Sequence, residues 1–157
     1  METSTFTESI PSNIEELKKM ARNKNNADIR IKAVEELGKW KCRQAIDVLW
    51  HLMINDLVYE VQHAAFLKLQ AFGEDVKLPK KKKGCLIKGI NKKIEKLLKG
   101  MPENSSYTAF CEQFENKEPE AFDVYKHDKK SKFDEWLKNV IKSKPQEYSN
   151  KIVSWDN

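Results

Sequence analysis

Residues 24–40 read KNNADIRIKAVEELGKW, and residues 56–72 read DLVYEVQHAAFLKLQAF. The two segments align without a gap, at a constant offset of 32 residues. The aligned apolar pairs are Ile29 with Val61, Ala33 with Ala65, Leu37 with Leu69, and Trp40 with Phe72. A fixed offset of roughly 20–50 residues is typical of stacked helical repeats. This stretch therefore predicts a helical hairpin followed by the first helix of a second one.

The spacing within each segment predicts a helix with one apolar stripe. Ala in the middle of each stripe lets a neighbouring helix approach closely. Between the two segments, residues 42–55 are apolar on nearly all sides. We expect them to form an inner helix that is covered by neighbours on both flanks.

The aligned segments resemble HEAT-type repeats, in the short bacterial form with a D-x-x-x-E-V-R-x-x-A-x-x-x-L-G pattern. The chain departs from that pattern at Lys24, Gln62 and Gln70, which replace an Asp, an Arg and a Gly. These departures weaken the expectation of a continuous Asp–Arg ladder. The resemblance implies a short α-solenoid of antiparallel helix pairs over residues 11–100. The residues that define the repeat are Ile29, Arg30, Ala33 and Leu37 in the first copy, and Val61, Gln62, Ala65 and Leu69 in the second. Generic helical hairpins of similar spacing are the alternative.

The ends of the chain differ from this central part. Residues 1–10 are polar and lack periodicity, so we expect disorder there. Ser12 and Glu15 form a capping-box pattern for a first helix that ends near Arg22. Gly100 and Pro102 mark a boundary, after which residues 101–157 predict a small helical bundle with an extended tail. The whole chain is therefore expected to be all-α.

Composition narrows the class of protein. Its 157 residues carry a net charge of +5, and the three cysteines, Cys42, Cys85 and Cys111, form no C-x-x-C pair. We expect neither a disulfide framework nor a zinc site. The same pattern indicates a protein of a reducing compartment. The most apolar run is too short to span a membrane, and the first residues lack the pattern of a secretory signal. We therefore expect a cytoplasmic protein that does not insert into membranes.

The charge is concentrated in one segment. Residues 77–99 contain ten Lys and one Glu, whereas the parts before and after each carry a net charge of −2. A predicted helix over residues 85–99 places four of these lysines in one row. Lysine without arginine suits phosphate contact better than base reading. A solvated Lys-rich surface is the plainer interpretation. The candidate polyanion-binding residues are Lys80, Lys81, Lys82, Lys83, Lys88, Lys92, Lys96 and Lys99.

The sequence lacks a recognisable catalytic pattern. No Ser/His/Asp or Cys/His set has a supporting motif, no Gly-rich phosphate loop is present, and the three histidines are far apart along the chain. We therefore expect no enzyme, no cofactor and no metal. The predicted function is a protein–protein interaction module, or adaptor, that uses the helical-repeat surface. The alternative is a nucleic-acid-binding accessory protein that contacts phosphates through residues 77–99.

Overall fold

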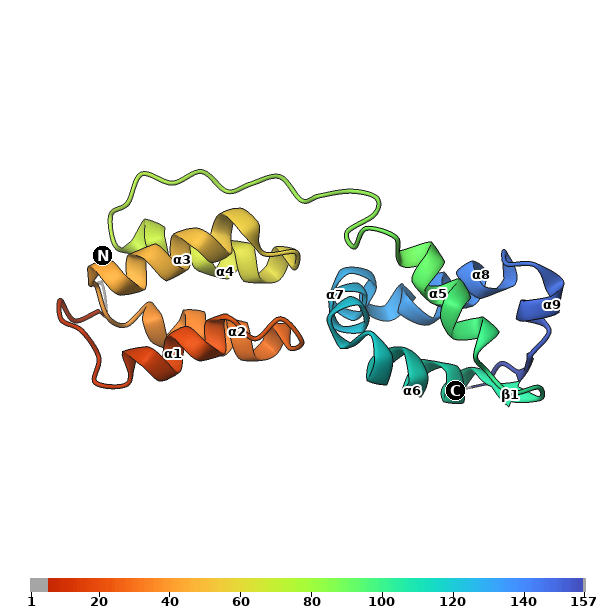
Figure 1. Cartoon of the computed structure of the whole chain (residues 1–157). Helices are drawn as coiled ribbons and strands as arrows, with labels where there is room; N and C mark the ends of the chain where they lie inside the picture. The colour runs from red at the N-terminus through yellow and green to blue at the C-terminus, as the bar shows by residue number, and fades with distance from the viewer. Residues whose placement is uncertain (1–5, 157) are drawn as a thin grey trace. The chain divides into compact units, whose positions relative to one another are not determined.

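The computed structural model describes residues 6–156, which are mostly helical (Figure 1). The chain divides into two compact units, Met1–Lys82 and Lys83–Asn157. They are joined by an extended segment, residues 73–83, without helix or strand. An all-α protein was expected, and its helical character is confirmed.

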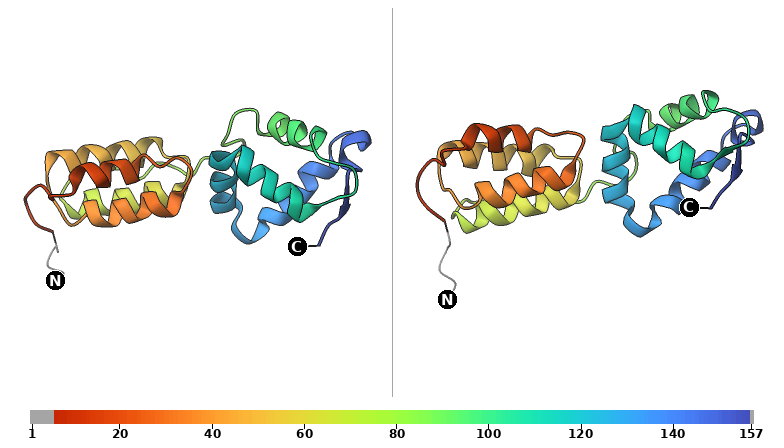
Figure 2. Two further views of the ribbon diagram at one scale, coloured as in Figure 1. Left: turned by 60° about the horizontal axis from the view of Figure 1, so that its bottom comes forward. Right: turned by 90° about the horizontal axis from the view of Figure 1, so that it is seen from below.

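The first unit consists of α1 (Ile14–Ala21), α2 (Ala27–Leu37), α3 (Arg43–Asn55) and α4 (Tyr59–Ala71). Helix α1 packs against α2 and α3 packs against α4, while α2 lies beside α4 and α1 beside α3 (Figure 2). The side chain of Asn26 caps α2 by accepting a hydrogen bond from the backbone N–H of Ile29, at 3.2 Å. The two hairpins thus form two layers, with α1 and α3 in one and α2 and α4 in the other.

The core of the first unit contains the residues that the 32-residue offset aligns. Ala33 and Ala65 are completely buried, and so are Leu37 and Leu69. Their small and branched side chains alternate where α2 lies beside α4, which lets the two helices approach closely. Leu49 and Met53 of α3 complete this core.

A buried ion pair holds the two hairpins together. Arg30 of α2 donates two hydrogen bonds to the Asp56 carboxylate, from Nε at 2.8 Å and from Nη2 at 3.0 Å. Its Nη1 donates a third to the backbone carbonyl of Asn23, at 2.7 Å. Asp56 also accepts a hydrogen bond from the backbone N–H of Val58. The bidentate geometry and these further bonds compensate for the cost of removing both charges from water.

Three details of the first unit differ from the sequence-based expectations. Helix α3 is not covered on all sides, because Arg43, Asp47 and His51 form an exposed row and Ile54 is 54% exposed. Helix α1 starts after Asn13 and has no side-chain cap, so the predicted capping box with Ser12 does not form. Helix α2 ends at Leu37, which places Trp40 in the turn that follows it.

The N-terminal segment is ordered where the structure describes it. The backbone of Thr7 donates to the carbonyl of Lys39 and accepts from the N–H of Lys41, each at 2.8 Å. The ring of Phe6 meets that of Phe72 edge-on, with centroids 5.1 Å apart. The expected disorder of residues 1–10 is therefore wrong for residues 6 and 7. Residues 1–5 lie outside the described part of the chain.

The second unit has helices α5 (Ile90–Lys99), α6 (Tyr107–Lys117), α7 (Pro119–Lys129), α8 (Phe133–Lys142) and α9 (Gln146–Ser149), with a 3-10 turn over Lys130–Lys132. Two short parallel strands, β1 (Ser105–Ser106) and β2 (Ile152–Ser154), pair the segment between α5 and α6 with the segment after α9. The core is aromatic: the ring of Phe114 lies 6.3 Å from Phe110 and 5.4 Å from Phe122. Edge-on and tilted ring pairs of this kind favour one fixed packing.

The predicted boundary at residue 100 is wrong, because α5 belongs to the second unit. Ile90, Ile94 and Leu98 are buried, and α5 packs against α6, α8 and α9. The helix is also shorter than expected. It begins at Ile90, after Gly89 with a φ of 75°, a left-handed conformation that glycine adopts without strain. The predicted extended tail instead contains α9 and β2.

The buried pair allows a prediction about stability. We expect Arg30→Ala to lower the free energy of unfolding by about 3–5 kcal/mol, because the Asp56 carboxylate is left buried without its partner. A matched control is Arg43→Ala, since Arg43 forms an ion pair with Asp47 in which the two side chains are 85% and 61% exposed. We expect the control to cost less than about 0.5 kcal/mol. Chemical denaturation of both variants measures the difference. Equal losses would contradict the role assigned to Arg30.

Candidate interaction surfaces

One pair of positions that the 32-residue offset aligns, Arg30 and Gln62, makes similar hydrogen bonds to backbone carbonyls. Gln62 occupies the position of Arg30, 32 residues later. Its Nε2 donates to the carbonyl of Met53 near the end of α3, at 2.9 Å. Arg30 likewise reaches the carbonyl of Asn23, which follows α1. Both side chains thus bind backbone at the end of the preceding helix. Val61 is buried, whereas its counterpart Ile29 is only half-buried.

A shallow groove lies between α2 and α4. It has a volume of about 320 Å³ and includes Ile31, Ala64 and Leu67, the last of which is 47% exposed. Glu35 and Lys68 form an ion pair across it, with Oε2 and Nζ 3.0 Å apart. We call this surface the α2–α4 groove. Its full lining is Ile31, Glu35, Glu60, His63, Ala64, Leu67 and Lys68.

An aromatic row borders the α2–α4 groove. The imidazole of exposed His63 lies between the rings of Tyr59 and Phe66, with centroid distances of 6.2 and 6.5 Å. The i, i+4 and i+3 spacing on α4 places the three rings on one helical face. The row combines apolar area with polar groups at its edge, a composition that is common in interface cores. The aligned apolar stripe does not predict it, because these residues lie on other faces of α4.

A second hollow in the first unit lies between α1 and α3. It has a volume of about 430 Å³ and is lined mainly by polar and charged side chains, among them Lys18, Arg22, Asp47 and His51. Lys18 is paired with Glu15 at 3.2 Å, and His51 lies 3.3 Å from the Asn55 amide. Lys18, Asp47 and His51 each have a neighbour on their own helix as partner, so these side chains do not converge on one point in the hollow.

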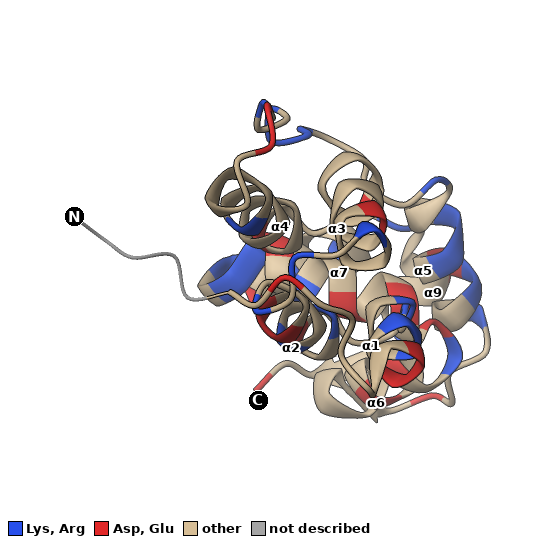
Figure 3. Ribbon diagram, turned by 90° about the vertical axis from the view of Figure 1, so that its left-hand side faces the viewer, with Lys and Arg blue, Asp and Glu red and all other residues tan. Residues whose placement is uncertain are grey.

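The eight candidate lysines are all exposed, but they do not form one row. Lys80–Lys83 lie in the extended segment, and Lys88 precedes α5. Only Lys92, Lys96 and Lys99 share the exposed face of α5, where blue segments follow one another along the helix in Figure 3. The predicted row of four is therefore reduced to three, because the helix does not extend back to residue 88. Lys99 lies over the ring of Tyr148, with Nζ 5.0 Å from the ring centroid.

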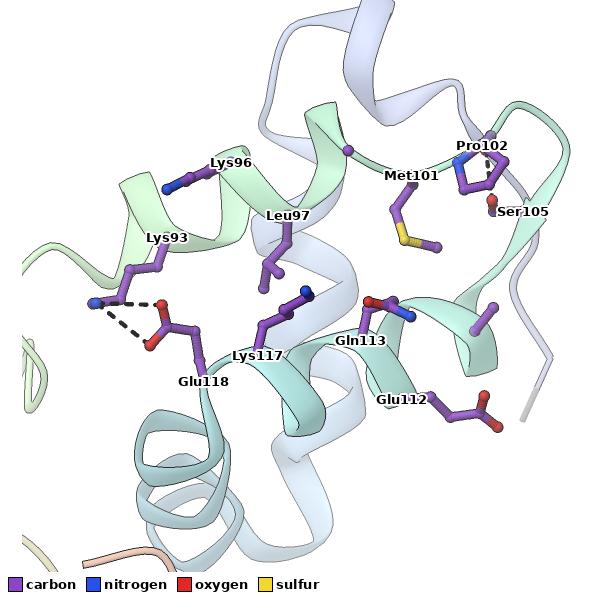
Figure 4. Close-up of a pocket in the computed structure, with 12 residues that line it drawn as sticks. Lys93, Lys96, Leu97, Met101, Pro102, Ser105, Glu112, Gln113, Lys117 and Glu118 are labelled. Carbon is purple, nitrogen blue, oxygen red and sulfur yellow. Dashed lines mark hydrogen bonds and ion pairs between the residues drawn. The ribbon is translucent and has the colours of Figure 1, made fainter.

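A further hollow lies between α5 and α6 and has a volume of about 870 Å³ (Figure 4). Leu97 and Met101 point into it, and Lys93 bridges it to Glu118, with Nζ 3.4 Å from both carboxylate oxygens. We call it the α5–α6 groove. The sequence singles out the α5 lysines but not this groove, because no local pattern indicates that α6 lies opposite.

A partly buried polar cluster around Tyr107 in the second unit bears on possible catalysis. The hydroxyl of Tyr107 donates to Asp134 Oδ1 at 2.6 Å. Burial, reinforced by this bond, raises the pKa of Tyr107, and burial also raises the pKa of the Cys111 thiol. A thiol with a raised pKa is a poor nucleophile at neutral pH, because the thiolate is the reactive form. Lys138 lies over the Tyr107 ring, 4.8 Å from its centroid. We interpret these contacts as packing interactions that hold the Tyr107 ring in place.

Within residues 6–156, no group of three or more His, Cys, Asp or Glu side chains is arranged to hold a metal ion. In the same residues, no helix is long and apolar enough to cross a membrane. The chain matches no protein family, and neither a curated protein nor a solved structure shows significant similarity to it.

Proposed function

We propose that this chain is a non-enzymatic adaptor whose first unit is a short HEAT-like stack that binds a partner protein. The observation that carries the proposal is the agreement between the two copies: the 32-residue offset aligns Arg30 with Gln62, and both bind the end of the preceding helix. Stacked helical pairs of this kind present continuous surfaces that commonly hold proteins or peptides. With two hairpins the surface is small, which favours modest affinity.

The α2–α4 groove is the partner-binding surface in this proposal. Leu67 is one of the four large apolar side chains that are most exposed within residues 6–156. Leu67 lies next to the aromatic row of Tyr59, His63 and Phe66. Aromatic side chains are enriched at interface centres, where they lose little conformational entropy on binding. A partner that covers Leu67 removes apolar area from water and leaves the Glu35–Lys68 pair at the rim.

Site-specific photo-crosslinking in cells of the native host tests this surface. A photoreactive amino acid at Leu67 should give a discrete covalent adduct with a partner protein, because the side chain lies in the proposed interface. The matched control carries the same amino acid at exposed Glu16 of α1, away from the α2–α4 groove. Ile31→Glu should abolish the adduct by placing a charge in the groove.

The outcome is read by mass spectrometry after purification under denaturing conditions. A proteome-wide smear of adducts that is the same from positions 67 and 16 would argue against a specific interface. So would a discrete adduct that persists in the Ile31→Glu variant, or the absence of any adduct from position 67.

Nucleic-acid binding through residues 77–99 is a second candidate function. It is favoured by the exposure of Lys92, Lys96 and Lys99 on one face of α5, close in sequence to the exposed Lys80–Lys83 run. Lysine ammonium groups in such an arrangement contact phosphates as point charges. Binding of this kind is tolerant of base sequence and sensitive to salt, because it releases counterions.

A titration with mixed-sequence DNA and RNA tests this candidate. With about four phosphate contacts, affinity should fall roughly 100-fold between 50 and 200 mM salt. Changing Lys88, Lys92, Lys96 and Lys99 to Gln should abolish binding. The control changes the same number of exposed lysines in the first unit, Lys19, Lys24, Lys32 and Lys39, and should retain it. Equal losses in the two variants would indicate a general charge effect and would exclude a localised site.

A further inference from the structure

The α5–α6 groove has the size and shape of a binding site. Its walls are α5 and α6, and its closed end is formed by the turn from Gly100 to Ser105 (Figure 4). The turn is held by the Ser105 hydroxyl, which donates to the carbonyl of Pro102 at 2.5 Å. Lys151 supports the same end by donating to the carbonyl of Lys99 at 2.7 Å. A groove with one end held in this way needs little reorganisation there to receive a ligand.

The floor of the groove is apolar. Leu97 is half-buried and points into the space, and the Met101 side chain reaches it from the turn. Ala109 of α6 adds a small side chain to the lining. Methionine adapts its shape to different apolar partners. The floor therefore favours apolar side chains of a ligand.

The charges around the floor are predominantly positive. Lys93 is already paired with Glu118. Lys96 projects from α5 and Lys117 from α6, and no carboxylate pairs with either of them among residues 6–156. Glu112 also lines the groove, but in Figure 4 its side chain points away from α5. Lys92 and Lys99 continue the positive edge along the outside of α5.

We propose that the α5–α6 groove binds a short, acidic, amphipathic segment of a partner protein. The apolar side of such a segment contacts Leu97 and Met101, and its carboxylates face Lys96 and Lys117. This is the helix-in-groove mode of recognition, in which apolar anchors recur at positions i, i+3 or i+4, and i+7. The proposal does not rest on the α2–α4 groove, because the residues that carry it all belong to the second unit.

The apolar floor favours this ligand over a nucleic acid. Phosphate contact alone uses exposed cations and leaves an apolar floor uncovered, whereas an amphipathic peptide covers the floor and pairs with the charges in the same binding event. Charge complementarity at the rim increases the rate of association, and the apolar contacts slow dissociation.

Selection from a display library of random peptides tests the proposal on the full chain. The selection is run in parallel on the unmodified protein, on the double variant Lys96→Glu/Lys117→Glu, and on the control Lys80→Glu/Lys82→Glu, which carries the same charge change on exposed lysines outside the groove. Thermal unfolding of all three proteins establishes that each is folded. We expect peptides that alternate Asp or Glu with helically spaced Leu, Ile, Phe or Met, enriched on the unmodified protein and on the control only.

Fluorescence anisotropy then measures the affinity of the most enriched peptide and of a scrambled version. The groove variant and the scrambled peptide should each weaken binding by about 10-fold or more, and the control should change it by less than about 3-fold. Selection of basic or purely apolar peptides would overturn the proposal, and so would the same peptides on all three proteins or no enrichment at all. The crosslink from Leu67 is unaffected by any of these outcomes, so the two proposals fail separately.

Discussion

The first unit depends on one buried ion pair. Arg30 and Asp56 are both about 95% removed from solvent, a placement that charged side chains tolerate only with full hydrogen bonding. Their bonds join α2, the turn after α1 and the start of α4. Arg30 lies in α2 and Asp56 shortly precedes α4, and these are the two helices that line the α2–α4 groove. Removing either member of such a pair strongly destabilises the fold, because the other charge is left buried and unpaired.

Part of this arrangement could be predicted from the sequence. The stripe with Ala33, Leu37, Ala65 and Leu69 predicts which faces of two helices are buried, since helical periodicity alone determines it. Arg30 was recognised only as a repeat position. Its partner could not be predicted, because Lys24 replaces the expected Asp in the first copy, and Asp56 lies 26 residues away from Arg30. Contacts between helices at that separation leave no periodic signal.

The second unit shows the same limit more strongly. The apolar stripe of Ile90, Ile94 and Leu98 predicts an amphipathic helix, but it does not indicate which helices cover that stripe. A boundary at residue 100 assigns α5 to the repeats, whereas the chain divides between Lys82 and Lys83, at the end of the extended segment of residues 73–83. The same error hides the α5–α6 groove, because its walls come from both sides of the boundary expected from sequence. Charge patterning nevertheless drew attention to Lys96, one of its rim residues.

We infer that the Arg30–Asp56 pair links the four helices of the first unit into one cooperative unit. Hydrogen–deuterium exchange on the full chain, with and without the Arg30→Ala substitution, tests this most directly. We expect amide protection to fall together across α1, α2, α3 and α4, because local stability there depends on the shared link. Protection in α5, α6 and α8 should stay unchanged. Loss confined to α2, or loss that spreads through the second unit, would contradict the account.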